Sequence, residues 1–168
     1  KPLLKINGKS FIDYQIKNLA RQGVKNIILL CCYKYKQFKK KYHNKKILSS
    51  KIICFNEKTP KGTGGGLLMI KKRLNKKFLV LNGDTIFDIN YLDICQRLKK
   101  TKLACIATTN KSGIRYDSLT NKKDIINAGI YVFDKKIFKY FKKKIISIEK
   151  DIFPKLIFYK KIQTVFYD

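Results

Sequence analysis

The stretch Lys77–Thr85, KFLVLNGDT, places a run of apolar residues directly before an Asn-Gly-Asp turn. An apolar run of this length without polar alternation predicts a strand that is covered on both faces. Residues 89–100, INYLDICQRLKK, follow with apolar residues at helical spacing, and residues 102–109, KLACIATT, have the pattern of the next strand. A buried strand, a helix and another buried strand in this order are typical of an α/β sheet.

The same alternation continues on both sides of this stretch. Ser10 is placed to cap the helix that follows it, and Gly23 is placed to end that helix. The chain therefore predicts one domain over residues 1–168, with a doubly wound, mostly parallel, Rossmann-like α/β sheet that binds ligands at the carboxyl ends of its strands. Further strands are expected at residues 26–32, 50–57, 128–133 and 162–167, and further helices at residues 35–43, 67–74, 135–141 and 148–156.

The chain is strongly basic, with 39 Lys and Arg residues against 11 Asp and Glu residues and a formal net charge of +28. Clustered positive charge is the usual footprint of a nucleic-acid-binding surface. Only four of the basic residues are Arg, however, which is the residue best suited to base edges and phosphate forks. We therefore treat nucleic-acid binding as a minor hypothesis, and we expect the charge to attract any polyphosphate ligand.

The cysteine and histidine content limits the kinds of site that the chain can carry. The five cysteines are odd in number and include no C-x-x-C pair, which indicates reduced thiols rather than disulfides or a zinc site. His43 is the only histidine, which leaves little material for a histidine metal site or a Ser-His-Asp triad. No apolar run is long enough to span a bilayer and no signal peptide is recognised, so we expect a cytoplasmic protein without a membrane partner.

A second unusual stretch is Thr59–Leu68, TPKGTGGGLL, which holds four of the nine glycines within five positions. It lies between a strand expected to end near Glu57 and a helix expected to begin near Gly65, so the positive end of the helix dipole would face a ligand in the loop. The glycines match neither G-x-G-x-x-G nor G-x-x-x-x-G-K-[ST]. A flexible strand-to-helix turn therefore explains the pattern as well as a ligand-binding loop does.

Three further segments lie where the predicted fold would place a ligand. Asp84 follows a buried strand, where a carboxylate is suited to hold Mg²⁺ together with substrate phosphates, or to serve only as a turn or helix-capping residue. Lys1-Pro2 and residues 126–131, INAGIY, are by themselves compatible with a chain end and a turn. The order of these segments along the chain is more informative than any one of them.

Five blocks, taken in this order, resemble the sugar-1-phosphate nucleotidyltransferases. Within that family the sequence is most similar to the guanylyltransferases that act on mannose 1-phosphate or on D-glycero-D-manno-heptose 1-phosphate. The similarity runs over almost the whole chain, which makes it far more specific than a single motif. The blocks are KPLLKINGKSFIDYQI at 1–16, KGTGGG at 61–66, FLVLNGDTIFDI at 78–89, INAGIYVF at 126–133 and SIEKDIFPKL at 147–156.

The resemblance implies an enzyme that joins a nucleoside triphosphate, with GTP preferred, to a heptose-type or mannose-type sugar 1-phosphate and releases pyrophosphate. It also implies Mg²⁺ as the cofactor, and positioning and charge neutralisation as the main sources of catalysis. The implied roles are phosphate contact for Lys1, Mg²⁺ binding for Asp84, nucleotide binding for Gly62, Thr63, Gly64 and Gly65, and sugar binding for Asn127 and Tyr116.

The chain departs from the family pattern in ways that bear on activity. Family members normally open with a strand and a G-x-G-T-R-type loop that wraps the triphosphate, and nothing precedes Lys1 here. The chain also has Arg115-Tyr116-Asp117 in place of the family's Arg-Tyr-Gly step, and it stops at Asp168, before the family's second metal-binding aspartate. We therefore expect a nucleotidyltransferase domain truncated at both ends, whose sheet lacks the family's first strand.

Two alternatives to an active enzyme follow. The first is a catalytically inactive or degenerate relative that binds nucleotide or a partner without turnover. The second, less favoured, is the basic nucleic-acid-binding domain that the net charge of +28 suggests. The oligomeric state is not predicted by any of these patterns.

Overall fold

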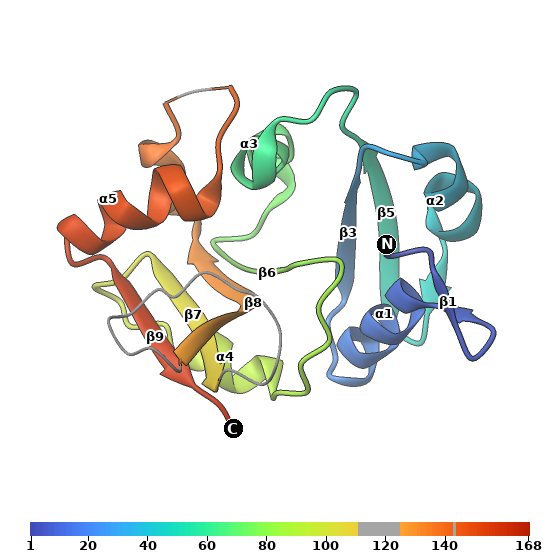
Figure 1. Cartoon of the computed structure of the whole chain (residues 1–168), viewed down its shortest axis with the longest axis horizontal. Helices are drawn as coiled ribbons and strands as arrows, with labels where there is room; N and C mark the ends of the chain where they lie inside the picture. Colours follow the sequence, from blue (N-terminus) through green and yellow to red (C-terminus); the bar gives the residue numbers. More distant parts are fainter. Residues whose placement is uncertain (111–124, 143) are drawn as a thin grey trace.

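The computed structural model of the chain describes residues 1–110, 125–142 and 144–168 (Figure 1). Strands and helices alternate along it, as the apolar pattern predicts. The strands are β1 Lys5–Ile6, β2 Lys9–Ser10, β3 Asn26–Cys31, β4 Lys46–Ile47, β5 Ser50–Asn56, β6 Lys77–Leu81, β7 Ala104–Asn110, β8 Ile125–Asp134 and β9 Ile162–Phe166. The helices are α1 Phe11–Arg21, α2 Tyr35–Tyr42, α3 Gly62–Met69, η1 Lys71–Arg73, α4 Tyr91–Arg97, η2 Lys135–Tyr140, η3 Ile148–Ile152 and α5 Phe153–Phe158.

The strands form two main sheets and one short hairpin. One sheet has the order β3-β5-β4, the other has the order β6-β8-β7-β9, and β1 pairs with β2. β3 is parallel to β5 and β7 is parallel to β9, whereas β8 runs antiparallel to both of its neighbours, β6 and β7. The α/β class is confirmed. The described strands form two main sheets rather than one, and β6, β7 and β9 run in one direction while β8 is reversed between β6 and β7. An apolar strand pattern predicts burial but not the direction in which a strand runs.

The two main sheets share their cores although no backbone hydrogen bonds join them among the described residues. There, β3 pairs only with β5 and β6 pairs only with β8, so each leaves one edge open. Leu29 of β3 and Leu79 of β6 nevertheless pack in one core, and Leu30 and Val80 pack in the other. The two sheets are therefore joined by side-chain packing between β3 and β6 in the described part of the chain.

Successive residues of the strands point into two different cores, one on each face of the sheets. On β7, Cys105 and Ala107 belong to the core that α1, α2 and α4 cover, whereas Ala104 and Ile106 belong to the core that α3, η2, η3 and α5 cover. This alternation is the side-chain period of a strand that is buried on both faces. The helices therefore lie on both faces of the strands, as in the predicted doubly wound arrangement.

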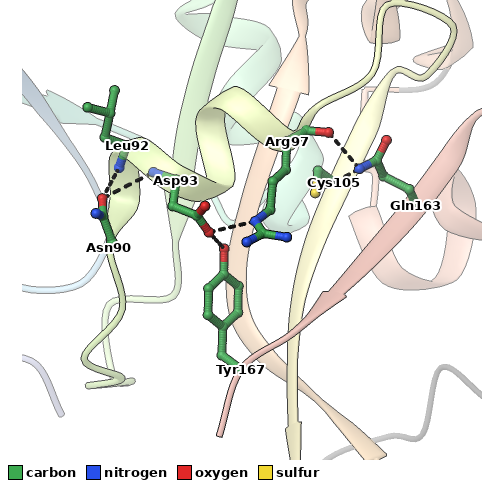
Figure 2. A network of polar contacts seen from close by, with 7 residues as sticks. All are labelled: Asn90, Leu92, Asp93, Arg97, Cys105, Gln163 and Tyr167. Atoms are coloured by element: carbon green, nitrogen blue, oxygen red, sulfur yellow. Dashed lines mark hydrogen bonds and ion pairs between the residues drawn. The ribbon is translucent and has the colours of Figure 1, made fainter.

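α4 is tied to the last strand by a polar network that Figure 2 shows. Asp93 of α4 accepts a hydrogen bond from Arg97 Nε at 2.7 Å and another from the Tyr167 hydroxyl at 2.7 Å. Gln163 of β9 donates from Nε2 to the Arg97 carbonyl oxygen at 2.8 Å. These bonds hold β9 and the residues after it against α4, so the edge strand is fixed by side chains as well as by its pairing with β7.

The cysteines are free thiols, as predicted. Cys31, Cys54 and Cys105 are buried, and Cys32 and Cys95 are half-buried. Burial raises the pKa of Cys31 to about 12 and that of Cys105 to about 11. Buried thiols with raised pKa values stay protonated and unreactive, so these cysteines serve as small apolar residues of the core. Among the described residues no helix combines the length and the apolar character needed to cross a membrane.

α1 begins with a charged cap that also fixes α2. Asp13 accepts a hydrogen bond from the backbone N–H of Ser10 at 2.9 Å, which is the return half of a capping box. It also accepts from Lys41 Nζ at 2.6 Å and from the Tyr42 hydroxyl at 2.7 Å. Burial by itself raises the pKa of Asp13, but these donors outweigh burial and lower the pKa below its ordinary value. The ionised carboxylate therefore stabilises the folded state.

Replacing Asp13 by Asn is expected to lower the free energy of unfolding by roughly 1–2 kcal/mol at pH 7, because one cap and one ion pair are lost. Since the folded state lowers the pKa of Asp13, its contribution is present above an ordinary carboxyl pKa of 3.8 and disappears as the pH falls through the lower value of the folded state. Urea unfolding at pH 7 and near pH 3 measures both effects. Asp88→Asn, at an exposed carboxylate, is the matched control. This account is contradicted if Asp13→Asn and the unaltered protein have the same free energy of unfolding at pH 7, or if their difference does not become smaller near pH 3.

Candidate active site

The glycine-rich segment forms the start of a helix rather than a loop before one. α3 begins at Gly62, whereas the sequence predicted a start near Gly65. The reason is a backbone pairing far along the chain: Gly64 N–H donates to the Ile146 carbonyl at 2.8 Å, and Ile146 N–H donates to the Lys61 carbonyl at 2.9 Å. Because the first N–H groups of a helix need outside partners, this pairing lets the helix begin earlier.

The glycines are required in this segment by close packing. A Cβ atom at Gly64 would lie 2.7 Å from Ile146 Cγ2, and one at Gly65 would lie 2.8 Å from the Lys144 carbonyl oxygen. Gly62 has a φ of +73°, which side chains rarely adopt, and a Cβ atom there would collide with the Ile146 carbonyl. Gly64 and Gly65 are buried, whereas Gly62 and Thr63 are exposed. Within the predicted nucleotide set, Gly62 and Thr63 are thus the surface that a ligand can reach.

Asp84 lies in an exposed turn that is clamped from two sides. The Asn82 carbonyl accepts a hydrogen bond from Gln15 Nε2 of α1 at 2.8 Å, and the Thr85 carbonyl accepts a second, short bond from the same amide. Asn82 N–H donates to the Gly129 carbonyl of β8 at 2.9 Å. Gln15 itself is buried. The turn therefore holds Asp84 at a fixed place at the carboxyl end of β6, while its side chain stays accessible.

The first residues of the chain lie against this turn. The position of a Cβ atom at Gly83 is 3.5 Å from Cγ of Pro2, an ordinary contact distance. The Pro2 carbonyl accepts a hydrogen bond from Ile12 N–H at 2.9 Å, which fixes the segment to the start of α1. Lys1 is exposed beside it. The structure thus brings the predicted phosphate-contacting lysine next to the turn that carries the predicted Mg²⁺ ligand.

A kink in β8 brings Gly129, two residues after Asn127, against the same turn. Gly129 has a φ of +71°, and the pairing of β7 with β8 shifts register between Ile106 and Thr108, opposite this kink. A Cβ atom at Gly129 would lie 2.9 Å from Asn82 Nδ2, so only glycine allows the strand to approach the turn this closely. Asn127 Oδ1 accepts a hydrogen bond from Gly129 N–H at 2.8 Å. The kink therefore brings the strand segment that holds Asn127 against the turn that holds Asn82.

A glutamate that sequence reasoning did not single out joins the glycine segment to Asn127. Glu149 accepts a hydrogen bond from Thr63 Oγ1 at 3.0 Å through Oε2 and one from the Tyr131 hydroxyl at 3.4 Å through Oε1. Asn127 Nδ2 donates in turn to the Tyr131 hydroxyl at 2.8 Å. A signal did exist in the sequence: the chain has only two glutamates, Glu57 and Glu149. Both bind the glycine segment, because Glu57 accepts from Lys61 N–H at 2.9 Å.

Tyr131 keeps its proton in this network. Burial raises the pKa of Tyr131, and the negative charge of Glu149 raises it further, against the lowering effect of the hydrogen bonds from Asn127 and Asn82. A protonated hydroxyl donates to Glu149 and accepts from Asn127, which matches the observed geometry. The direction of every hydrogen bond from Asn127 to Glu149 is therefore defined.

The residues at the turn fit one part of a magnesium site. Mg²⁺ is commonly held by one or two carboxylates together with substrate phosphates and water, and Asp84 is an accessible carboxylate of that kind. The described part of the chain contains no group of three or more His, Cys, Asp or Glu side chains able to hold a metal by themselves. Beside Asp84, the buried Thr85 hydroxyl has no partner among the described residues, which leaves it free for a further polar group. Tyr116, the second predicted sugar-binding residue, lies outside the described residues.

Comparisons with known proteins point to one family. The family model described as nucleotidyl transferase matches residues 1–118. The chain is 34% identical over 157 residues to the D-glycero-alpha-D-manno-heptose 1-phosphate guanylyltransferase of Campylobacter jejuni, covering 84% of this chain and 69% of the relative. It is 30% identical over 182 residues to the mannose-1-phosphate guanyltransferase of Yarrowia lipolytica, covering 93% of this chain and 49% of the relative. The chain thus spans about half the length of that relative.

A solved structure agrees with the sequence comparisons. HddC from Yersinia pseudotuberculosis complexed with GMP-PN has a TM-score of 0.85 and 26% sequence identity to this chain, covering 99% of this chain and 80% of that chain. At this level of identity and coverage the same fold extends over nearly all of the chain. The predicted Rossmann-like nucleotidyltransferase fold is therefore confirmed.

Replacing Gly64 by Ala is expected to lower the free energy of unfolding by roughly 1–3 kcal/mol, because the new methyl group would overlap Ile146. The double variant with Ile146→Ala should lose about 1 kcal/mol less than the sum of the two single losses, since the two sites are in direct contact. Urea unfolding of the two single variants and the double variant measures this coupling. Gly83→Ala, whose methyl group would make only an ordinary contact at 3.5 Å, is the control. If Gly64→Ala is as stable as Gly83→Ala, the glycines are not there for packing.

Proposed function

This chain belongs to the nucleotidyl transferase family, and from that premise we propose that it makes a nucleotide sugar from a nucleoside triphosphate and a sugar 1-phosphate. We propose GTP as the nucleotide and a heptose-type or mannose-type 1-phosphate as the sugar. The names of the curated relatives and the GMP-PN complex of the structural neighbour support this choice. The five free thiols agree with a reducing compartment, so we propose that the reaction takes place in the cytoplasm.

In the proposed reaction a phosphate oxygen of the sugar 1-phosphate attacks the α-phosphorus of the triphosphate in line. The new oxygen–phosphorus bond forms as the bond from the α-phosphorus to the oxygen that bridges it to the β-phosphorus breaks, and pyrophosphate leaves with that bridging oxygen. No group of the protein becomes covalently bound to the substrates. The work of the protein is to align the two substrates and to neutralise the charge on the phosphates.

The observation that supports this function best is the meeting of three distant segments at the carboxyl end of β6. Pro2 contacts the turn at Gly83, and Gly129 of β8 contacts the same turn at Asn82. Lys1, Asp84 and Asn127 are thereby brought to one edge of the sheet, which is where α/β folds bind their ligands. A structural turn has no need of a lysine, an aspartate and an asparagine from three separate segments.

Each residue then has a role set by its chemistry. Lys1 would neutralise the triphosphate, and the net charge of +28 would attract both anionic substrates to the surface. Gly62 and Thr63 would contact the nucleotide. Gly64 and Gly65 would position them by their close packing against Ile146 and Lys144. Asn127 would face the sugar, with Tyr116 assigned to the sugar as well. Asp84 would hold Mg²⁺, which when bound supplies positive charge to the phosphates during transfer.

The test is pyrophosphate release by the purified protein with GTP, Mg²⁺ and mannose 1-phosphate or heptose 1-phosphate. Asp84→Ala is expected to reduce this release by roughly a hundredfold or more, because the only carboxylate of the turn is lost. Asp88→Ala, at another exposed aspartate of the same segment, should leave the rate within about a factor of two, since surface substitutions have small effects.

Three outcomes separate the hypotheses. Release that depends on Asp84 supports the enzyme. If the protein binds GTP but releases no pyrophosphate from any of the four common nucleoside triphosphates, the enzyme hypothesis is contradicted and an inactive nucleotide-binding relative is favoured. The basic nucleic-acid-binding domain is favoured if the protein shows neither pyrophosphate release nor GTP binding, but binds nucleic acid. This binding should weaken steeply with salt and be unaffected by Asp84→Ala.

A further inference from the structure

Glu149 sits where two separate arms of the site meet. One arm is the hydroxyl of Thr63 in α3, which donates to Oε2 of Glu149 at 3.0 Å. The other arm runs from Asn127 Nδ2 to the Tyr131 hydroxyl at 2.8 Å and from there to Oε1 of Glu149 at 3.4 Å. The Ser147 hydroxyl also donates to Oε2, at 3.0 Å. One carboxylate therefore receives three hydroxyl protons, from Thr63 of α3, from Tyr131 of β8 and from Ser147 just before η3.

The charge of Glu149 defines the direction of these bonds. A carboxylate can only accept, so Thr63 and Tyr131 must both use their single hydroxyl proton on it. The Tyr131 oxygen is then left to accept, which requires the N–H₂ side of the Asn127 amide to face it. The carbonyl side of Asn127 faces Gly129 N–H at 2.8 Å, as this orientation demands. An amide that is free to flip would offer a sugar hydroxyl two different patterns, whereas this one offers a single pattern.

The same logic applies to Thr63. Its hydroxyl donates to Glu149 and accepts from Ile148 N–H at 2.9 Å. The one lone pair that remains can only accept a hydrogen bond from a ligand. Thr63 is thereby matched to an N–H group of a base or to a ribose hydroxyl and not to an ionised phosphate oxygen, which has no proton to give.

We propose that Glu149 is a positioning residue that sets the hydrogen-bonding direction of Thr63 toward the nucleotide and of Asn127 toward the sugar, so that one carboxylate prepares both substrate subsites. This inference rests on the proposed function, since it assigns those two ligands to the two arms. Glu149 itself touches neither substrate. Its effect is carried by Thr63 on one side and by Tyr131 and Asn127 on the other.

The experiment compares Glu149→Gln with variants that break one arm each. Glutamine keeps the size of the side chain but brings a donor, so it cannot accept from all three hydroxyls. Glu149→Gln is expected to raise KM for GTP and KM for the sugar 1-phosphate by roughly tenfold each, with a smaller change in kcat. Thr63→Val should raise KM for GTP alone, and Tyr131→Phe should raise KM for the sugar 1-phosphate alone.

A matched control separates positioning from stability. Asp151 lies in the same helical turn, η3, and accepts from Ser147 N–H at 2.7 Å, but in the described part of the chain it makes no hydrogen bond to Thr63, Tyr131 or Asn127. Asp151→Asn should loosen η3 and lower Tm as Glu149→Gln does, while both KM values stay unchanged. A readout without turnover is the Asn127 side-chain amide signal in NMR spectra of the protein alone, which should shift in Glu149→Gln and not in Asp151→Asn.

The outcomes are distinguishable. If the unaltered protein releases no pyrophosphate and binds neither substrate, the proposed function fails and this inference fails with it. If the unaltered protein is active but Glu149→Gln keeps both KM values, or changes them no more than Asp151→Asn does, the proposed function stands and the role of Glu149 is overturned. The role of Glu149 is supported if Glu149→Gln raises both KM values and also shifts the Asn127 amide signal.

Discussion

The kink at Gly129 is the constraint on which the site depends. Its φ of +71° turns β8 toward the Asn82–Thr85 turn, and a Cβ atom at this position would lie 2.9 Å from Asn82 Nδ2 and 3.2 Å from Thr85 Oγ1. Any side chain would push the strand and the turn apart. With the kink in place, Asn82 N–H bonds to the Gly129 carbonyl, Gln15 clamps the other side of the turn, and Asp84 is held at the end of β6. The position of the carboxylate thus follows from one backbone conformation.

The glycine segment plays the same part on the other side of the site. Its glycines allow α3 to approach Ile146, and that approach brings Thr63 to Glu149. Glu149 in turn reaches Asn127 through Tyr131. The site is therefore built from two close backbone approaches joined by one carboxylate. In a chain with 39 Lys and Arg residues against 11 Asp and Glu residues, a hydrogen-bond network centred on a glutamate is a specific arrangement that does not follow from the overall charge.

Much of the fold could be predicted from the sequence because the strands are apolar on both faces and helix starts such as that at Ser10 carry recognisable caps. The direction of β8 could not be predicted, since an apolar strand has the same pattern in either direction. The start of α3 at Gly62 could not either, because it depends on a pairing with Ile146. In the site, Asp84 and the segment that holds Asn127 were singled out by their place in the predicted fold, and the family resemblance assigned their roles, which stay predictions. Glu149 was missed because Thr63 lies 86 residues away from it in the chain and no local pattern reports that contact.

The most direct test of the central claim is a crystal structure of the protein with a non-hydrolysable GTP analogue, Mg²⁺ and a sugar 1-phosphate. The account predicts the base or ribose at Gly62 and Thr63, the metal at Asp84, the phosphates beside Lys1, and the sugar against Asn127, with the hydrogen bonds of Glu149 unchanged. A nucleotide bound elsewhere on the surface, or one whose phosphates contact Thr63 while the turn at Asp84 stays empty, would contradict it.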